Sequence, residues 1–489
     1  MAIQQQICGM DAVALAEAIR SKSLSPSEVL DAHLERIAIL EPFLHSFCLV
    51  AFESARREAR EVGDRILRGD VVGPLAGIPI GIKDLVCTAG LTTTGGSIAY
   101  RDFVPDEDDV VVERIKSAGA IIVGKTNVSE LGYGGIGHNP VFETTRNPWN
   151  TDLTPGGSSA GSGSAVASGE VPFAVGSDGG GSIRIPSAHS GIFGMKPSMG
   201  RVPLYPGCRD ERYPGLSSWE SLEHLGPMSR TVADSALLLS VMAGPDPRDR
   251  HSLPEANFDW RECVNGDLKG LRVAYSPDWG YAAVDPQVRR VVDEAVKVFE
   301  RDLGCSVEIA HPGWSDPSET FAAIVAMDSD LEGMRDMVKR FGSQMSPHLV
   351  ALVQRPWTAE EFTNAGMARK ALANKMWRFM SGYDLLLTPT LAVPPFPVHS
   401  MGPATIDGRS VGPRGWSAFV FPINLTGQPA ASVPAGFTED GLPVGLQIVG
   451  RHLADQTVLK ASAAFERVRP WRDRWPSLLA EKGLIAKLC

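Results

Sequence analysis

The chain has 489 residues, of which 43% are hydrophobic and 21% are charged, a composition typical of a globular protein that can bury a large core. Its net charge of −10 argues against nucleic acid as a partner, because phosphate binding needs basic patches. No apolar run approaches the roughly 20 residues that a membrane helix requires, so we expect no membrane span.

The seven cysteines are odd in number and widely scattered, at positions 8, 48, 87, 208, 263, 305 and 489. None forms a Cys-x-x-Cys pair, so the sequence indicates neither a disulfide framework nor a zinc site. The N-terminal residues lack the basic start and apolar core of a signal peptide. We therefore expect a cytoplasmic protein without a metal ion or cofactor. Cys208 is a candidate for a pocket wall, although an inert thiol is the favoured interpretation.

The first part of the chain, about residues 1–70, is predicted to be a helical cover. Residues 11–20 carry apolar side chains at helical spacing. Ser25 is followed by Pro26 and, three positions on, by Glu28, which predicts the capped start of a second helix. We expect no chemistry from this cover.

Residues from about 75 to 245 alternate short apolar strands with helices, as expected of an α/β catalytic core. The first strand, residues 78–82, is almost wholly apolar and is followed by Lys83. Because burial disfavours the ammonium ion, a lysine here can have a lowered pKa and act as a base. Lys125 and Lys196 are rival lysines that the pattern alone does not exclude.

Two segments rich in glycine and serine are the most informative feature of the chain. The first covers residues 156–162 and contains Ser158, and the second covers residues 176–186 and contains Ser182. Glycines tolerate positive φ and leave backbone N–H groups unshielded, so such turns can direct several donors at an anion. The pair indicates a nucleophile with an oxyanion site and a partner hydroxyl.

The remainder divides into a variable region, about residues 246–380, and a closing part of the core, about residues 381–475. The closing part contains strands near residues 430–434 and 444–449. The helical segment 317–344 suits either a lid or the core, and core packing is favoured for its three methionines, Met327, Met334 and Met337.

Three further motif matches are disfavoured by the residues around them. Residues 119–126 fit the phosphate-loop pattern, but their middle residues favour a strand. Residues 132–137 fit the dinucleotide fingerprint, but no strand precedes them, so we expect a loop beside the active site or a plain surface turn. Residues 157–161 fit the nucleophile elbow and would nominate Ser159, yet a loop precedes them and no histidine stands out as a base.

With these segments in view, the chain resembles the amidase signature family over roughly residues 10–475. Besides Lys83 and the two Gly/Ser segments, the resemblance rests on residues 118–127, 145–149, 191–198 and 421–429. It implies an α/β fold, an α/β/α sandwich with a central mixed, mostly parallel β-sheet covered by helices on both faces. It also implies a single amidase domain over residues 1–489.

The resemblance implies a Ser-cisSer-Lys triad. It assigns Lys83 as the base, Ser158 as the bridging cis-serine and Ser182 as the acylated nucleophile. Ser182 would attack the carbonyl while Ser158 relays its proton to neutral Lys83.

The loop around Ser182 would supply the oxyanion hole through backbone N–H groups of Gly179, Gly180, Gly181 and Ser182. Asp178 and Arg184 are expected to organise this loop through hydrogen bonds rather than to act directly. Gly179 stands where the family usually has threonine or another side chain, which is expected to loosen the loop or enlarge the space for substrate. Ala160 stands where glycine is frequent.

The acyl group of the substrate is expected to be apolar or aromatic. The glutamine-hydrolysing subunit of the tRNA-dependent amidotransferase, within the same family, offers a carboxylate near the position of Ser417, and this chain has none there. Candidate pocket residues, several of them equally suited to the core, are Tyr133, Gly134, Gly135, Tyr205, Trp416 and Phe419.

We therefore expect a stand-alone hydrolase of a small, apolar or aryl amide, similar to bacterial amidases and aryl acylamidases, with water as the second substrate. Hydrolysis of a carbamate (urethane) or ester by the same triad is an alternative. Two others are the glutamine-hydrolysing component of a tRNA-dependent amidotransferase complex and a serine esterase with its nucleophile at Ser159. The oligomeric state stays open, with a homodimer as one candidate.

Overall fold

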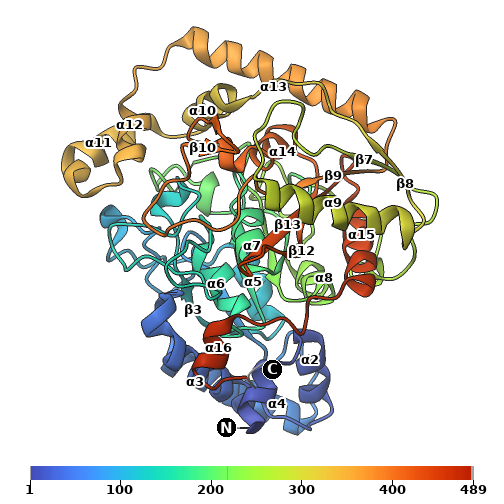
Figure 1. Cartoon of the computed structure of the whole chain (residues 1–489). Helices are drawn as coiled ribbons and strands as arrows, with labels where there is room; N and C mark the ends of the chain where they lie inside the picture. The colour runs from blue at the N-terminus through green and yellow to red at the C-terminus, as the bar shows by residue number, and fades with distance from the viewer. Residues whose placement is uncertain (1, 217, 486–489) are drawn as a thin grey trace.

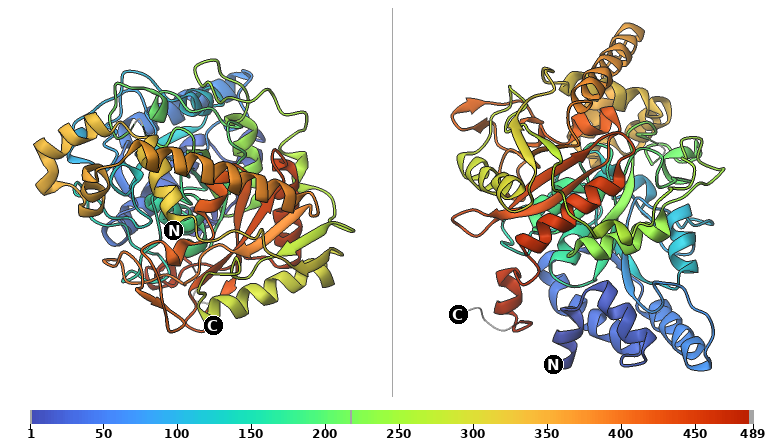
Figure 2. Two further views of the ribbon diagram at one scale, coloured as in Figure 1. Left: turned by 90° about the horizontal axis from the view of Figure 1, so that it is seen from above. Right: turned by 90° about the vertical axis from the view of Figure 1, so that its right-hand side faces the viewer.

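One sheet of eleven strands runs through the part of the chain that the computed structural model describes, residues 2–216 and 218–485. The strand order is β1-β3-β2-β4-β6-β5-β12-β13-β9-β7-β8, with helices on both faces (Figures 1 and 2). A separate ribbon pairs β10 with β11. The strands are β1 (Phe47–Val50), β2 (Pro79–Lys83), β3 (Ile121–Thr126), β4 (Phe173–Ser177), β5 (Phe193–Lys196), β6 (Leu225–Ser229), β7 (Arg272–Tyr275), β8 (Ser306–Ile309), β9 (Leu385–Pro389), β10 (Thr405–Ile406), β11 (Arg409–Ser410), β12 (Ala430–Phe437) and β13 (Pro443–Gly450).

The directions of these strands confirm a mixed α/β sheet but correct the expectation that it is mostly parallel. Parallel ladders join β2 to β3 and β4, and β7 to β8 and β9. The other six ladders of the large sheet are antiparallel. The reason is that the hairpin β12–β13, together with β5 and β6, inserts antiparallel strands between two parallel groups of three.

The helices that flank the centre of the sheet lie on opposite faces. Helices α6 and α7 pack against each other on one face, whereas α8, α9 and α15 pack together on the other. Within the described residues, no helix combines the length and the apolar character needed to cross a membrane. The helices are α1 (Ala2–Cys8), α2 (Ala12–Arg20), α3 (Pro26–Leu44), α4 (Phe52–Arg68), α5 (Val110–Ser117), α6 (Ala160–Ala167), α7 (Arg184–Ser190), α8 (Val232–Met242), α9 (Pro286–Arg301), α10 (Ser318–Met327), α11 (Leu331–Phe341), α12 (Pro347–Gln354), α13 (Ala359–Met380), α14 (Phe421–Thr426), α15 (Asp455–Val468) and α16 (Ser477–Glu481).

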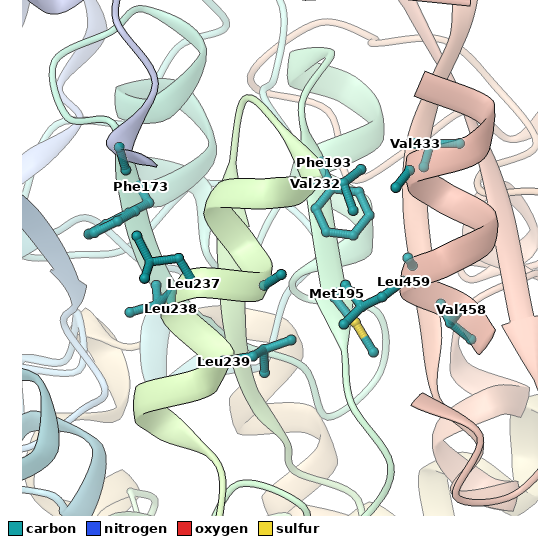
Figure 3. Packing of buried hydrophobic residues seen from close by; sticks show 14 of the residues in the cluster. Phe173, Phe193, Met195, Val232, Leu237, Leu238, Leu239, Val433, Val458 and Leu459 are labelled. Carbon is teal, nitrogen blue, oxygen red and sulfur yellow. The ribbon is translucent and has the colours of Figure 1, made fainter. Parts of the chain in front are cut away.

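The apolar core between α8, α15 and the sheet holds the strands in place from the face opposite α6 and α7 (Figure 3). Leu238 of α8 and Leu459 of α15 are fully buried and face the same layer as Phe173 of β4 and Phe193 of β5. Burial of each such side chain contributes about 1.5–3 kcal/mol to the free energy of folding. This layer fixes β4, whose carboxyl end carries the second Gly/Ser segment.

The N-terminal helices α2, α3 and α4 lie at one end of the molecule, and α13 lies at the other (Figures 1 and 2). The predicted cap of α3 is confirmed. Ser25 Oγ accepts a hydrogen bond from Glu28 N at 3.1 Å, and Glu28 Oε2 accepts one from Ser25 N at 2.8 Å. Pro26 occupies the first turn. This reciprocal pair satisfies donors that a helix start otherwise leaves free.

The segment 317–344 is helical as predicted, but it divides into α10 and α11. Residues 328–330 separate the two helices, and Asp330 caps the start of α11 by accepting a hydrogen bond from Gly333 N at 2.8 Å. Met334 and Met337 are buried, as favoured from the sequence, whereas Met327 at the end of α10 is 46% exposed. Core packing therefore holds for the two methionines of α11.

Candidate active site

Lys83 and Ser177 end two neighbouring parallel strands. β2 pairs with β4 through Ile82 and Val175, so the carboxyl ends of both strands meet at one edge of the sheet. Lys83 Nζ donates hydrogen bonds to Ser177 Oγ and to Ser158 Oγ, each at 2.7 Å. This lysine thus connects the two Gly/Ser segments, although they are far apart in the sequence.

Burial lowers the pKa of Lys83 to about 8. The negative charges of Glu223 and Asp178 act in the opposite direction and raise it, but they do not offset the loss of hydration. A lysine with this pKa is about one-tenth free amine at pH 7 and about half free amine at pH 8, and the free amine can accept a proton.

The peptide bond between Gly157 and Ser158 is cis, and Ser158 and Ser159 differ in their surroundings. Ser159 is fully buried, donates to Ser177 O at 3.2 Å and accepts from Ser177 N at the same distance. Ser158 instead contacts Lys83 and lines a cavity. These contacts give Ser159 a structural function and disfavour the nucleophile-elbow interpretation.

Close packing of α6 holds this loop against the sheet. A Cβ atom at Gly161 would lie 2.1 Å from Ser46 O and 2.3 Å from Asn127 N, so a side chain at this position would clash with backbone. Ala160 begins the helix with its side chain fully buried. The glycine at position 161 therefore lets the helix closely approach the backbone next to β1 and β3.

Ser182 lies on the loop between β4 and α7, where two cavities meet. The inner cavity has a volume of about 40 Å³ and is also lined by Ser158, Ser177 and Glu223. The outer cavity has a volume of about 360 Å³. Ser182 lines both, together with Gly132, Gly180 and Trp219, and is 9% exposed.

Asp178 and Arg184 form an ion pair within this loop. Arg184 donates from Nε and Nη2 to the Asp178 carboxylate, each at 2.9 Å, and both side chains are fully buried. Burial alone would raise the pKa of Asp178, but the Arg184 guanidinium holds it well below its usual range. Asn424 Nδ2 donates to the same carboxylate at 2.9 Å and connects the loop to α14.

The backbone N–H groups of the loop divide into two kinds. Gly181 N donates to Asp178 Oδ1 at 2.8 Å, so the expectation that it takes part in an oxyanion hole is corrected. Its donor is already used to shape the turn. Among the described residues, the N–H groups of Gly179, Gly180 and Ser182 form no such internal hydrogen bond, which leaves them as candidate donors.

The predicted pocket residues Tyr133, Gly134, Gly135 and Trp416 all line the outer cavity. Tyr205 does not: its ring lies beneath Arg248, with the guanidinium carbon 5.7 Å from the ring centroid. Tyr205 lines neither the inner nor the outer cavity, which corrects the prediction for this residue. Phe419 is fully buried and packs on Trp279 in the core.

Several cavity residues were not singled out from the sequence. Glu223 lines the inner cavity, and Phe321, Phe421 and Arg414 line the outer one. Cys208, considered as a pocket candidate, lines the inner cavity, and burial raises the pKa of its thiol to about 12. An unreactive thiol is the result.

The rival lysines have structural partners elsewhere. Lys125 Nζ donates to the hydroxyls of Thr88 and Thr93, each at 3.0 Å. Lys196, the last residue of β5 rather than a loop residue, donates to Gln428 O at 2.6 Å. Within the described residues, neither lysine forms a hydrogen bond with Ser158 or Ser182, whereas Lys83 Nζ donates to Ser158 Oγ at 2.7 Å.

The remaining motif matches also have structural explanations. Residues 121–126 form β3 rather than a phosphate-binding loop. Residues 132–135 belong to a loop that lines the outer cavity, as one of the two interpretations predicted. Among the described residues, the His189 side chain forms one hydrogen bond, which Nε2 donates to Val393 O at 3.3 Å, and its ring packs edge-on against Phe396.

Comparisons with known proteins agree with this geometry. The family model Amidase matches residues 28–459. The chain is 38% identical to an acylamidase of Rhodococcus erythropolis, over 97% of this chain and 98% of that protein. It is 36% identical to a glutamyl-tRNA(Gln) amidotransferase subunit of Carboxydothermus hydrogenoformans, over 96% of this chain and 99% of that protein.

Solved structures give the same result. A bacterial aryl acylamidase of the amidase signature family superposes with a TM-score of 0.88 at 30% identity, covering 98% of this chain and 99% of that one. A 6-aminohexanoate cyclic dimer hydrolase superposes with a TM-score of 0.86 at 29% identity, covering 96% and 99%. The family model spans most of the sequence and the fold is shared throughout, so the chain belongs to the Amidase family and is a hydrolase of amide C–N bonds.

Proposed function

We propose that the protein cleaves small apolar or aryl amides through an acyl-enzyme on Ser182, with Ser158 and Lys83 as the proton relay. The observation that carries this proposal is the 2.7 Å hydrogen bond from Lys83 Nζ to Ser158 Oγ, in the cavity that Ser182 also lines. The relay needs a base that is partly neutral, and the lowered pKa of Lys83 meets this need.

The proposed reaction has two halves. Ser182 Oγ attacks the carbonyl carbon, its proton passes to Ser158, and the Ser158 proton passes to Lys83 Nζ. The C–N bond then breaks, and the relay runs in reverse to protonate the leaving amine. Water repeats the sequence on the acyl-enzyme and releases the acid. The N–H groups of Gly179, Gly180 and Ser182 would hold the oxyanion; in other enzymes one such donor contributes about 3 kcal/mol.

The substrate class follows from the outer cavity. Its walls include the rings of Trp219, Phe321, Phe421 and Trp416, which suit an aromatic or branched apolar group. The segment that contributes Trp416 and Ser417 brings no carboxylate of its own to the cavity. The names of two similar proteins, an acylamidase and an aryl acylamidase, support the same class.

Single substitutions test the proposal. Ser182→Ala should abolish anilide hydrolysis, and Ser158→Ala and Lys83→Ala should each lower kcat by about 100-fold to 10,000-fold. Mass spectrometry of the wild-type protein quenched during turnover should find the acyl group on the peptide that contains Ser182. Wild-type rates for Ser182→Ala would reject the proposal.

A substrate panel separates the alternatives. Aryl anilides, primary amides and carbamates with one common aryl group should be compared for product release by the isolated chain. Faster turnover of the carbamates would identify a urethanase with the same nucleophile. An isolated chain that is inactive on all three would instead favour a component that works within an amidotransferase complex.

A further inference from the structure

The inner cavity contains a carboxylate that the proposed triad does not use. Glu223 lines this cavity together with Ser158, Ser177 and Ser182. It belongs to the turn before β6, where its backbone N donates to Trp219 O at 2.8 Å. Within the described residues, Glu223 forms no ion pair at 4.0 Å or less. Removing a charged carboxylate from water costs free energy unless a partner compensates for it, so the position of Glu223 in this cavity indicates a role there.

Gly179 leaves the space that this carboxylate fills. A Cβ atom at Gly179 would lie 2.4 Å from Glu223 Oε2 and 2.9 Å from Trp219 Cε3. The backbone of Gly179 does not have a positive φ, so the glycine is required for space rather than for conformation.

Ser177 connects the carboxylate to the lysine. Its hydroxyl accepts a hydrogen bond from Lys83 Nζ at 2.7 Å, and Ser177 and Glu223 line the same inner cavity. Because Ser177 Oγ accepts from Lys83, its own proton can be donated to a carboxylate in that cavity. Lys83 also donates to Ser158 Oγ, so Ser177 and Ser158 meet at the lysine.

We propose that Glu223 is a positioning residue that acts through Ser177 on Lys83 and stabilises the ammonium ion formed when Lys83 takes the proton during acylation. The inference rests on the proposed role of Lys83 as the base. The proton that leaves Ser182 ends on Lys83, opposite the Glu223 carboxylate, and returns to the leaving amine when the C–N bond breaks. Glu223 itself neither gains nor loses a proton over the cycle.

The charges around the pair agree with this assignment. Burial raises the pKa of Glu223 to about 7, while Lys83 and Arg209 lower it and Asp178 raises it. Asp178 also raises the pKa of Lys83, but its carboxylate is neutralised by the ion pair with Arg184. Within the described residues, Glu223 is therefore the nearby carboxylate without an ion-pair partner, and its negative charge can stabilise the Lys83 ammonium ion.

The test is the pH dependence of kcat/KM for Glu223→Gln with an aryl anilide. Without the carboxylate the ammonium ion is less stable, so the acid limb should move from near pH 8 to lower pH. On the alkaline plateau the rate should fall about tenfold to a hundredfold, because a weaker base removes the proton. Glu223→Asp keeps the charge and should keep the limb near its wild-type position.

A matched control is Glu170→Gln, since burial likewise raises the pKa of Glu170 to about 7 but Glu170 lies outside both cavities. It should keep the wild-type profile. An unchanged acid limb in correctly folded Glu223→Gln, or a move to higher pH, would overturn the inference. If Lys83→Ala retained wild-type activity, the proposed function would fail first; an inactive Lys83→Ala with an unchanged Glu223→Gln profile rejects only the role of Glu223.

An independent observation concerns the outer cavity. Arg414 lines it, and its guanidinium carbon lies 5.6 Å from the centroid of the Phe321 ring. That ring in turn packs on the oxyanion loop, since a Cβ atom at Gly180 would lie 2.6 Å from Phe321 Cζ. In the described part of the chain, the Arg414 side chain forms no hydrogen bond and no ion pair at 4.0 Å or less. Burial lowers the pKa of Arg414, and the negative charges of Glu319 and Asp316 act in the opposite direction.

The geometry points to Arg414 as the binding group for a carboxylate or similar anion on the substrate. A guanidinium with unused donors beside an aromatic wall, in the cavity that Ser182 also lines, suits an aryl or alkyl amide that carries such a group. This second inference also rests on the proposed function, and it narrows the substrate class to amides with an acidic substituent.

The test uses pairs of anilides that differ only in a carboxylate or its methyl ester on the acyl group. The wild-type protein should have a KM about tenfold lower for the carboxylate, and Arg414→Gln should remove this difference by raising the KM of the carboxylate to that of the ester. Arg290→Gln, which removes a surface arginine paired with Glu439, is the control. Equal KM values in the wild type would reject the anion site, whereas failure to hydrolyse either compound would reject the proposed function.

Discussion

Glu223 Oε2 occupies the space that a side chain at Gly179 would need, because a Cβ atom there would lie only 2.4 Å from this oxygen. The glycine and the carboxylate therefore form a complementary pair beside Ser177 and Lys83. A change at either member should disturb the other, and this gives a test that leaves Glu223 itself intact.

Gly179→Thr should lower kcat/KM by about tenfold or more and move the acid limb to lower pH. The added side chain forces the Glu223 carboxylate or the Trp219 ring to shift, and a shifted carboxylate no longer supports Lys83 through Ser177. General acid–base contributions of about 100-fold to 10,000-fold leave room for such a loss. The measurement is a pH–rate profile on an aryl anilide.

The control is Gly366→Ala in α13, where an added Cβ atom meets nothing within 4 Å. This variant should keep the wild-type profile and, because alanine favours a helix interior, gain stability of about 1 kcal/mol. A Gly179→Thr variant with a wild-type profile would show that the Gly179–Glu223 contact has no bearing on Lys83.

The activity of the wild-type protein should depend on pH through Lys83. Burial lowers the pKa of this lysine to about 8, and the free amine is the reactive form. Below that pH the ammonium ion predominates, so kcat/KM should fall about tenfold per pH unit and should level off above pH 8. Measurement of kcat/KM for one neutral anilide between pH 5 and pH 10 checks the direction. A rate that rises on acidification would exclude Lys83 as the base.

The proposed triad could be found from the sequence because each member carries a strong local signal. Lys83 ends an apolar run, and Ser158 and Ser182 stand in glycine-rich turns. The resemblance to the amidase signature family then assigned the base, the bridging serine and the nucleophile to these three residues. The structure adds the pairing of β2 with β4, which brings Lys83 next to Ser177, a residue that no local pattern singled out.

The remaining features depend on tertiary contacts that a local pattern does not contain. Glu223 and Arg414 lie in irregular segments and reach the cavities only because distant strands meet there. The N–H of Gly181 is unavailable to an oxyanion because it donates to Asp178 Oδ1. Tyr205 lines neither cavity, and its ring lies next to the Arg248 guanidinium. The directions of the strands also depend on tertiary contacts, because the hairpin β12–β13 pairs antiparallel with its neighbours β5 and β9.

The two adjacent serines should separate cleanly on substitution. Ser158→Ala removes the hydroxyl that Lys83 contacts and should lower kcat by about 100-fold to 10,000-fold. Ser159→Ala removes only the two hydrogen bonds with the Ser177 backbone, at a cost of about 1–3 kcal/mol of stability, and should retain most of the activity. Steady-state rates and thermal unfolding on the same samples provide both numbers. The reverse order of activities would restore Ser159 as the nucleophile.

Arg184→Met should destabilise the protein by about 3–5 kcal/mol at neutral pH, because it leaves the Asp178 carboxylate buried without its partner. In the wild type the pKa of Asp178 is held below its unfolded value of 3.8, so this contribution is present above about pH 4 and is lost as the pH falls further. The difference in unfolding free energy between wild type and variant should therefore shrink on acidification. Urea unfolding at pH 7 and at several pH values below 4 measures it.

The double variant Asp178→Asn, Arg184→Met removes the stranded charge as well as its partner. It should recover part of the stability that Arg184→Met loses, while remaining inactive because the loop no longer aligns Gly179, Gly180 and Ser182. If the double variant were less stable than Arg184→Met at pH 7, the charge of Asp178 would not be the source of the loss. The hydrogen bonds that Asp178 accepts from Gly181 and Asn424 would then account for it.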